Sequence, residues 1–127
     1  MRKVFFLLAL FFLFGCASEQ EAVNYNTVYM DRCLSTGMMA VGLDDDIRAD
    51  TGLPALDGMY IANVEPRSAA ASAHLKTGDV LLQVGEMEVY DKESFAKAFL
   101  ELEGKKRATV KVWRKGALFN FELPLTF

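Results

Sequence analysis

The stretch GMYIANVEPRSAAASAHLKTGDVLLQV, residues 58–84, carries the most specific structural pattern in the chain. Its first part is rich in Tyr, Ile and Val and predicts a β-strand. A proline turn follows, and Ser68 can cap a short alanine-rich helix that runs to about His74. The tripeptide TGD at residues 77–79 then reverses the chain into a second, buried strand at residues 80–84. The stretch therefore predicts strand, helix, turn and strand in that order.

A longer helix is predicted further along the chain. Asp91 is a good N-cap residue, and Gly104 stands where a C-terminal cap glycine is expected. Between them, apolar residues recur at i, i+4 and i+7, which places them on one face of an amphipathic helix. These residues are Phe95, Phe99 and Leu102.

Two alternating segments predict a terminal hairpin. Residues 107–114 and 118–125 each alternate apolar and polar side chains, and Lys115-Gly116 makes the turn between them. A short strand at residues 87–89 is expected to pair with residues 80–84 across a type II′ turn at Gly85-Glu86. The sequence thus predicts a mainly β fold with two helices, a small β-sandwich or partly open barrel, over residues 38–127.

The N-terminus has the pattern of an export signal. Arg2 and Lys3 precede an apolar run of eleven residues, Val4 to Phe14, which is too short to span a membrane. The segment LFGC, residues 13–16, resembles the lipobox of bacterial lipoproteins. That resemblance implies cleavage before Cys16 and acylation of its sulfur and new amino group. Ala17 resembles the signal that sorts such proteins to the outer membrane.

The predicted organisation is a signal peptide at residues 1–15, a lipidated cysteine and tether at residues 16–37, and one domain after it. The tether is expected to contain some extended structure, with residues 27–30 (TVYM) as one edge strand. Cys33 would then have no intramolecular partner, and we expect it to be a buried small apolar residue.

Composition argues against nucleic acid as a partner. The formal charge is −3, and it falls to −5 when Arg2 and Lys3 leave with the first fifteen residues. A nucleic-acid-binding protein usually shows the opposite sign or a basic stripe. Here the basic cluster at residues 105–107 is predicted to be a solvated turn.

Taken in order, the predicted elements resemble the PDZ domains of bacterial envelope proteins, notably those that follow the protease domain of the high-temperature-requirement serine proteases. That family shows a strand, a V-x-P-x-S-x-A-A turn and helix, an L-x-x-G-D-V segment, a hairpin, a helix and two final strands. The resemblance covers about residues 38–125. His74 replaces the glycine that is usual before Leu75, and His is among the few other residues enriched at positive φ. The matching positions are Val64, Pro66, Ser68, Ala70, Ala71, Leu75, Gly78, Asp79 and Val80.

The resemblance implies peptide binding by strand addition between a sheet edge and the amphipathic helix. The segment AVGL, residues 40–43, matches the loop whose backbone N–H groups receive a terminal carboxylate, and Gly42 would let the backbone approach closely. On the residues alone, Phe95 and Phe99 are better interpreted as core, which leaves Ala96 as the truer groove residue. The implied peptide-binding residues are Ala40, Val41, Gly42, Leu43, Phe95, Ala96 and Phe99.

Catalytic interpretations are weaker. Asp50 lies in a DTG tripeptide like that of retroviral-type aspartic proteases, but its context predicts a short solvated helix from Asp44 that stops at Gly52. His74, the single histidine, lies in a turn with no nucleophile pattern nearby. We expect no catalytic residue, no metal site and no cofactor.

Two functions from different classes remain. The first is a lipid-anchored, non-catalytic binding module of the bacterial envelope, whose partner is the C-terminal tail or an extended peptide of another envelope protein. The second is an assembly or scaffold subunit of a secretion or envelope complex, whose groove is filled by a fixed partner or by its own tether, with NTVYM, residues 26–30, as the candidate segment. A hydrolase using Asp50 is a remote third.

Overall fold

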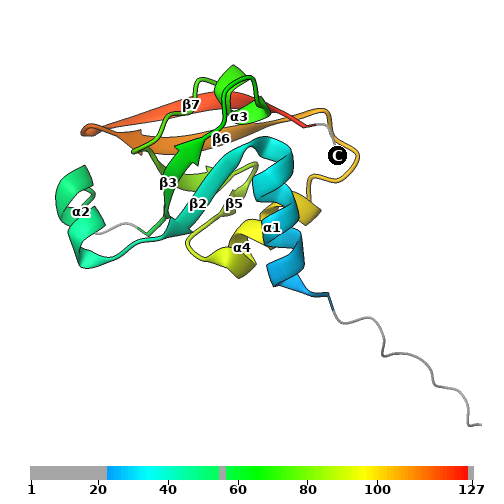
Figure 1. Ribbon diagram of the computed structural model, residues 1–127, viewed down its shortest axis with the longest axis horizontal. Helices are drawn as coiled ribbons and strands as arrows, with labels where there is room; N and C mark the ends of the chain where they lie inside the picture. Colours follow the sequence, from blue (N-terminus) through cyan, green and yellow to red (C-terminus); the bar gives the residue numbers. More distant parts are fainter. Residues whose placement is uncertain (1–22, 55–56, 126–127) are drawn as a thin grey trace, which may run out of the picture.

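The computed structural model describes residues 23–54 and 57–125. A six-stranded antiparallel sheet has the order β2-β3-β4-β6-β7, with the short β5 paired to β4 (Figure 1). Its two end strands do not pair with each other, so the sheet is open. The strands are β2 (Met38–Gly42), β3 (Met59–Val64), β4 (Val80–Val84), β5 (Met87–Glu88), β6 (Arg107–Arg114) and β7 (Ala117–Pro124). The helices are α1 (Tyr25–Thr36), α2 (Asp45–Thr51), α3 (Ala69–Ser72) and α4 (Lys92–Leu100).

The mainly β prediction is confirmed, and the predicted helix starts are confirmed with it. Ser68 caps α3 by accepting a hydrogen bond from the Ala71 N–H, at 3.1 Å. Asp91 and Ser94 form a reciprocal capping box at the start of α4, which satisfies N–H groups that the first turn leaves unpaired. Asp44 caps α2 by accepting a hydrogen bond from the Ile47 N–H, and α2 ends at Gly52 as expected.

Backbone angles follow the turn chemistry of the sequence. His74 adopts the positive φ of 68° that its place in the resemblance suggested. Gly85 has a φ of 61° while Glu86 is not among the residues of positive φ, as a type II′ turn requires. Lys115 and Gly116 both have positive φ, which defines a type I′ turn and suits the strand twist of a two-residue hairpin.

The two faces of the sheet carry separate apolar clusters. The larger cluster lies between the sheet and the two helices α1 and α4, and it includes Phe95 and Phe99. The smaller cluster joins Leu53, Val80 and Leu82 beneath α2. Burial on both faces explains why β4 is apolar at nearly every position rather than alternating.

The edge strand predicted at residues 27–30 is wrong, because this segment lies within helix α1. Asn24 accepts a hydrogen bond from the Thr27 N–H and begins the helix, and Gly37 ends it in the left-handed conformation. The fold has four described helices: the two counted in the predicted fold class, the short helix α2 expected after Asp44, and α1, which was not predicted. The packed part of the chain therefore begins at α1, ahead of the expected boundary at residue 38.

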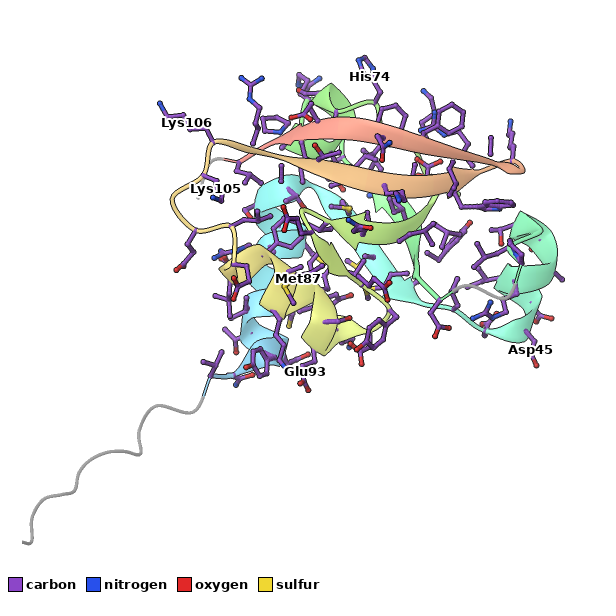
Figure 2. All side chains as sticks on the ribbon, turned by 180° about the vertical axis from the view of Figure 1, so that it is seen from behind. Asp45, His74, Met87, Glu93, Lys105 and Lys106 are labelled. Atoms are coloured by element: carbon purple, nitrogen blue, oxygen red, sulfur yellow. The ribbon has the colours of Figure 1, made fainter. Side chains whose placement is uncertain are left out.

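Two other expectations concern the N-terminal segment and the basic cluster at residues 105–107. The predicted signal peptide and Cys16 lie outside the described residues. Lys105 and Lys106 are exposed where the chain passes from α4 into β6, as predicted for a solvated turn (Figure 2), and Arg107, the first residue of β6, is exposed beside them. Within residues 23–54 and 57–125, no helix has both the length and the apolar character needed to cross a membrane.

Candidate functional site

Strand β2 is one end of the sheet, and helix α1 lies beside it and beside α4 (Figure 1). An end strand presents backbone N–H and C=O groups that no neighbouring strand pairs. Strand addition needs such an edge next to a helix. In this chain a helix of the same chain occupies part of that position.

Tyr29 is the centre of the contact between α1 and its surroundings. Its hydroxyl donates a hydrogen bond to the Ala40 carbonyl of β2. Its ring meets the Phe95 ring edge to face, with centroids 5.5 Å apart, and the Lys92 ammonium lies 5.2 Å from the ring centroid. Burial, together with the neighbouring Cys33 thiol, raises the pKa of Tyr29 to about 12. Tyr29 thus links α1 to both β2 and α4 as a neutral hydrogen-bond donor.

Further contacts hold α1 along its length. The Lys97 ammonium lies 5.3 Å from the Tyr25 ring centroid near the start of the helix. Arg32 forms an ion pair with Glu103 at 3.6 Å near its end. Cys33 is buried in the main cluster, as its sequence interpretation predicted. The helix is therefore attached at both ends and at its middle.

Gly37 makes the corner between α1 and β2. Its φ is +78°, and its carbonyl accepts a hydrogen bond of 2.8 Å from the Glu65 N–H. A Cβ atom added at Gly37 would lie 2.2 Å from the Ser68 Cβ. No other residue fits here without a shift of the backbone. The position of α1 on the β2 edge depends on this glycine.

An apolar groove of about 460 Å³ remains open between α1 and the adjoining ends of β2 and β3. Its lining includes Met30, Leu34 and Met39, which are among the most exposed large apolar residues of the described chain. Leu34 is 82% exposed. Flexible methionine side chains adapt to ligands of different shape. The groove is therefore suited to apolar side chains of an extended ligand.

The structure places the predicted loop at the far end of β2 from Gly37. Ala40 points into the core and is fully buried, whereas Gly42 is exposed and has open space where a Cβ would lie. Leu43 packs with the smaller apolar cluster beneath α2. Val41, between them, is half-buried.

The predicted helix residues belong to the main cluster instead. Phe95, Ala96 and Phe99 are all fully buried, and the rings of the two phenylalanines lie 4.8 Å apart. The interpretation of Phe95 and Phe99 as core residues is confirmed. Leu43 is therefore not in the same cluster as Phe95, and the ligand-binding role of these positions stays a prediction.

The sequence interpretation missed Tyr29, Gly37 and Met39. A signal for the first two was present, because Asn24 and Gly37 are good cap residues at the two ends of a helical pattern. The residues that share the buried face between them are Tyr25, Tyr29 and Cys33, at i, i+4 and i+8.

The residues considered for catalysis lie apart from this edge. Asp50 is exposed on α2. His74 follows α3, where its carbonyl accepts a hydrogen bond from Arg114, and Figure 2 shows it on the side of the molecule that carries β7. Within the described parts of the chain, no group of three or more His, Cys, Asp or Glu residues could hold a metal ion.

The family model described as PDZ domain matches residues 35–125, which is most of the chain and nearly all of the described fold. The chain belongs to the PDZ family. The match begins at the C-terminal end of α1 and runs through β7. The resemblance stated from the sequence is confirmed for the domain, and most of α1 is an addition to the matched region.

Curated relatives of this PDZ domain include the magnetosome formation protease MamE from Magnetospirillum gryphiswaldense and from Paramagnetospirillum magneticum. Each is 31% identical over 87 residues, which is 68% of this chain. The chain spans only 11% and 12% of the length of those two proteins. Their names describe proteases, but the likeness covers a small part of each.

Solved structures with the same fold include the HtrA-type protease AlgW with a decapeptide and the HtrA3 PDZ domain bound to a phage-derived ligand. The first has a TM-score of 0.61 and 22% identity, covering 70% of this chain and 27% of that one. The second has a TM-score of 0.57 and 17% identity, covering 69% of this chain and 80% of that one. These similarities show a PDZ fold.

Proposed function

We propose that this PDZ domain binds the C-terminal tail or an extended segment of another envelope protein by strand addition at β2, without catalysis of its own. The observation that carries the proposal is that β2 ends the sheet beside an open apolar groove. Backbone pairing along such an edge supplies affinity, and pockets for alternate side chains supply specificity. Two similar structures were solved with a peptide ligand, which supports the same use here.

The proposed ligand site has two parts. Met39 and Leu34 offer an apolar surface that a ligand side chain can reach in the structure as it stands. Gly42 and its neighbours from residue 40 to residue 43 offer backbone at the other end of β2. Phe95 lies beneath Tyr29, so a ligand side chain reaches it only when α1 moves.

A peptide-binding titration tests the proposal. The chain starting at Ala17 retains every residue that the structure describes, and it is titrated against a library of free C-termini and internal extended peptides. Met39→Arg and Gly42→Leu should each weaken binding by about tenfold or more, because they place charge or bulk along the β2 edge. Leu118→Arg, on the opposite end strand, is the control and should leave binding unchanged. Equal binding of all peptides, or no effect of either β2 variant, contradicts the proposal.

A lipid anchor at Cys16 would hold this domain at a membrane surface of the bacterial envelope. The proposed location is the periplasmic face of the outer membrane. The short apolar run and the LFGC segment support it. Mass spectrometry of the mature N-terminus should find acylated Cys16 as the first residue. Cys16→Ser should release the protein from the membrane fraction. An N-terminus at another residue, or an unmodified Cys16, contradicts the anchor.

The second candidate function is a scaffold subunit whose groove is filled by α1. The hydrogen bond from the Tyr29 hydroxyl to the Ala40 carbonyl favours it, because that carbonyl lies on β2, the strand proposed to receive a peptide. The segment is helical rather than extended, so it covers the edge with side chains instead of adding a strand.

Weakening the start of α1 distinguishes the two functions. Asn24→Ala removes the cap that holds the Thr27 N–H and should cost the helix about 1 kcal/mol. If α1 fills the groove, peptide affinity rises in this variant; if the groove is already open, affinity stays the same. Asp44→Ala, which removes the matching cap of α2, is the control for loss of a cap elsewhere.

A further inference from the structure

The opposite end of the sheet is an apolar strand, β7, whose outer backbone edge pairs with no described strand. Among the described strands β7 pairs with β6 alone, α3 packs against it, and it lies at the far side of the sheet from α1 and α4 (Figure 1). Leu118 is 55% exposed and Phe119 is 39% exposed, and residues 117–121 carry no charge. Glu122 and Pro124, the residue types that usually protect an edge strand, stand only near its C-terminal end.

The hairpin geometry determines which backbone groups of β7 are free. In a two-residue type I′ hairpin the closing pair, here Arg114 and Ala117, exchanges both backbone hydrogen bonds. Hydrogen-bonded and non-hydrogen-bonded pairs then alternate along the ladder. The N–H and C=O groups that point away from β6 are therefore those of Leu118, Asn120 and Glu122.

Side chains on the core-facing side of this edge are held in a fixed arrangement. The Phe119 and Phe121 rings are stacked, with centroids 5.9 Å apart and planes 5° from parallel. The Arg114 guanidinium lies 5.3 and 5.0 Å from the two ring centroids. Asp79, only 1% exposed, accepts two hydrogen bonds of 2.8 Å from that guanidinium. An arrangement ordered before binding loses little conformational entropy when a partner arrives.

We propose that β7 pairs antiparallel with β7 of a second copy of this chain, about a two-fold axis at Asn120. In this register Asn120 faces Asn120 of the second copy, and Leu118 faces its Glu122. These are the residues whose backbone groups point away from β6, so the Asn120–Asn120 and Leu118–Glu122 pairs are hydrogen-bonded pairs, and the pairs between them are non-hydrogen-bonded pairs. Phe119 then faces Phe121 of the second copy, which joins the two ring stacks into one apolar cluster across the interface.

Charge and chain chemistry disfavour the registers centred on the two other outward-facing residues, and they favour a second copy as the occupant. An axis at Glu122 would place two carboxylates directly opposite each other and would pair Asn120 with Pro124, which has no N–H. An axis at Leu118 would leave only the first three residues of β7 paired, because the turn follows immediately. With the axis at Asn120, a strand of the same sequence meets no like charge and satisfies both edges at once.

The oligomeric state of the chain starting at Ala17 tests the proposal. Sedimentation equilibrium should show a reversible dimer. Asn120→Lys places two ammonium groups opposite each other and should weaken self-association about tenfold at low salt. Asn26→Lys, the same change at an exposed position of α1, is the control. A monomer at the highest soluble concentration, or equal effects of the two variants, overturns the proposal.

A cysteine cross-link tests the register itself. In this register the two Asn120 Cα atoms lie about 5.5 Å apart, within reach of a disulfide, whereas the two Leu118 Cα atoms lie about 14 Å apart. Asn120→Cys should therefore form a covalent dimer on mild oxidation, and Leu118→Cys should not. The native Cys33 is buried and does not interfere. Faster cross-linking of Leu118→Cys than of Asn120→Cys contradicts the register.

Discussion

The two ends of the sheet are finished in opposite ways. At β2 the chain covers its own edge with α1, and a tyrosine hydroxyl caps one of the strand's carbonyls. At β7 the outer edge pairs with no described strand, and the strand carries stacked aromatic rings beside a guanidinium held by Asp79. An open sheet presents unpaired backbone at both ends, and both need a partner or a cover. The comparison teaches that a helix of the same chain lies against part of one edge, whereas the outer edge of the other pairs with no described strand.

The largest expected effect comes from the corner that holds α1 on the β2 edge. Gly37→Ala should lower the free energy of unfolding by about 4 kcal/mol, because its Cβ overlaps Ser68 and its φ is left-handed. Urea denaturation measures the change. Gly42→Ala, at the other end of β2, meets no atom within 4 Å and should change stability by less than about 1 kcal/mol. Equal effects of the two substitutions would show that the corner does not position α1.

A smaller loss is expected from the ion pair that orders the β7 edge. Asp79→Asn should lower the free energy of unfolding by about 2 to 3 kcal/mol, because it leaves the partly buried Arg114 guanidinium without a charged partner. The carboxylate of Asp79 also raises the pKa of Arg114, chiefly through their hydrogen bond. Asp57→Ala breaks the exposed pair with Arg48 and should cost less than about 1 kcal/mol. Thermal or urea unfolding compares the two variants.

The smallest expected effect comes from the Tyr29 hydroxyl. Tyr29→Phe removes its hydrogen bond to Ala40 and should lower the free energy of unfolding by about 1 kcal/mol at neutral pH. Tyr90→Phe, at an exposed tyrosine, is the control. If Tyr90→Phe lowers the free energy of unfolding as much as Tyr29→Phe does, the Tyr29 hydroxyl does not stabilise the contact between α1 and β2.

The same residue gives a pH dependence of known sign. Because the folded pKa of Tyr29 is raised from 10.0 to about 12, the folded protein retains the phenol proton at a pH where the unfolded chain releases it. The stability that this group contributes is complete below pH 10 and is lost as the pH rises from 10 through 12. Urea titrations across this window should show a steeper loss of stability for the native protein than for Tyr29→Phe. Equal losses of stability in the native protein and in Tyr29→Phe would contradict the raised pKa of Tyr29.

Local sequence signals predicted most of the PDZ fold. Caps such as Ser68 and Asp91, the positive φ at His74 and the terminal hairpin depend on residues near in sequence, so they could be recognised from the sequence. Helix α1 had cap residues at both ends, but Thr27, Val28 and Tyr29 favour strands, and its stability depends on packing against α4, so its local sequence did not decide it.

The candidate site was only partly predictable for a related reason. The sequence identified Phe95 and Phe99 as one helical face, and their burial follows from that pattern. Which side of β2 the preceding segment covers depends on the backbone turn at Gly37, and no periodicity encodes it. The groove lined by Met39 and Leu34 exists only because α1 takes that position.

The direct join between α1 and β2 at Gly37 has a kinetic and thermodynamic consequence for any ligand of the covered edge. A helix attached by a single residue competes as an intramolecular ligand, so its effective concentration stays fixed when the protein is diluted. The apparent affinity for a peptide that needs α1 displaced is the intrinsic affinity multiplied by the small fraction of molecules in which the helix has moved. Every ligand that needs α1 displaced is weakened by the same factor, so a peptide occupies this edge only when its concentration exceeds its raised apparent Kd.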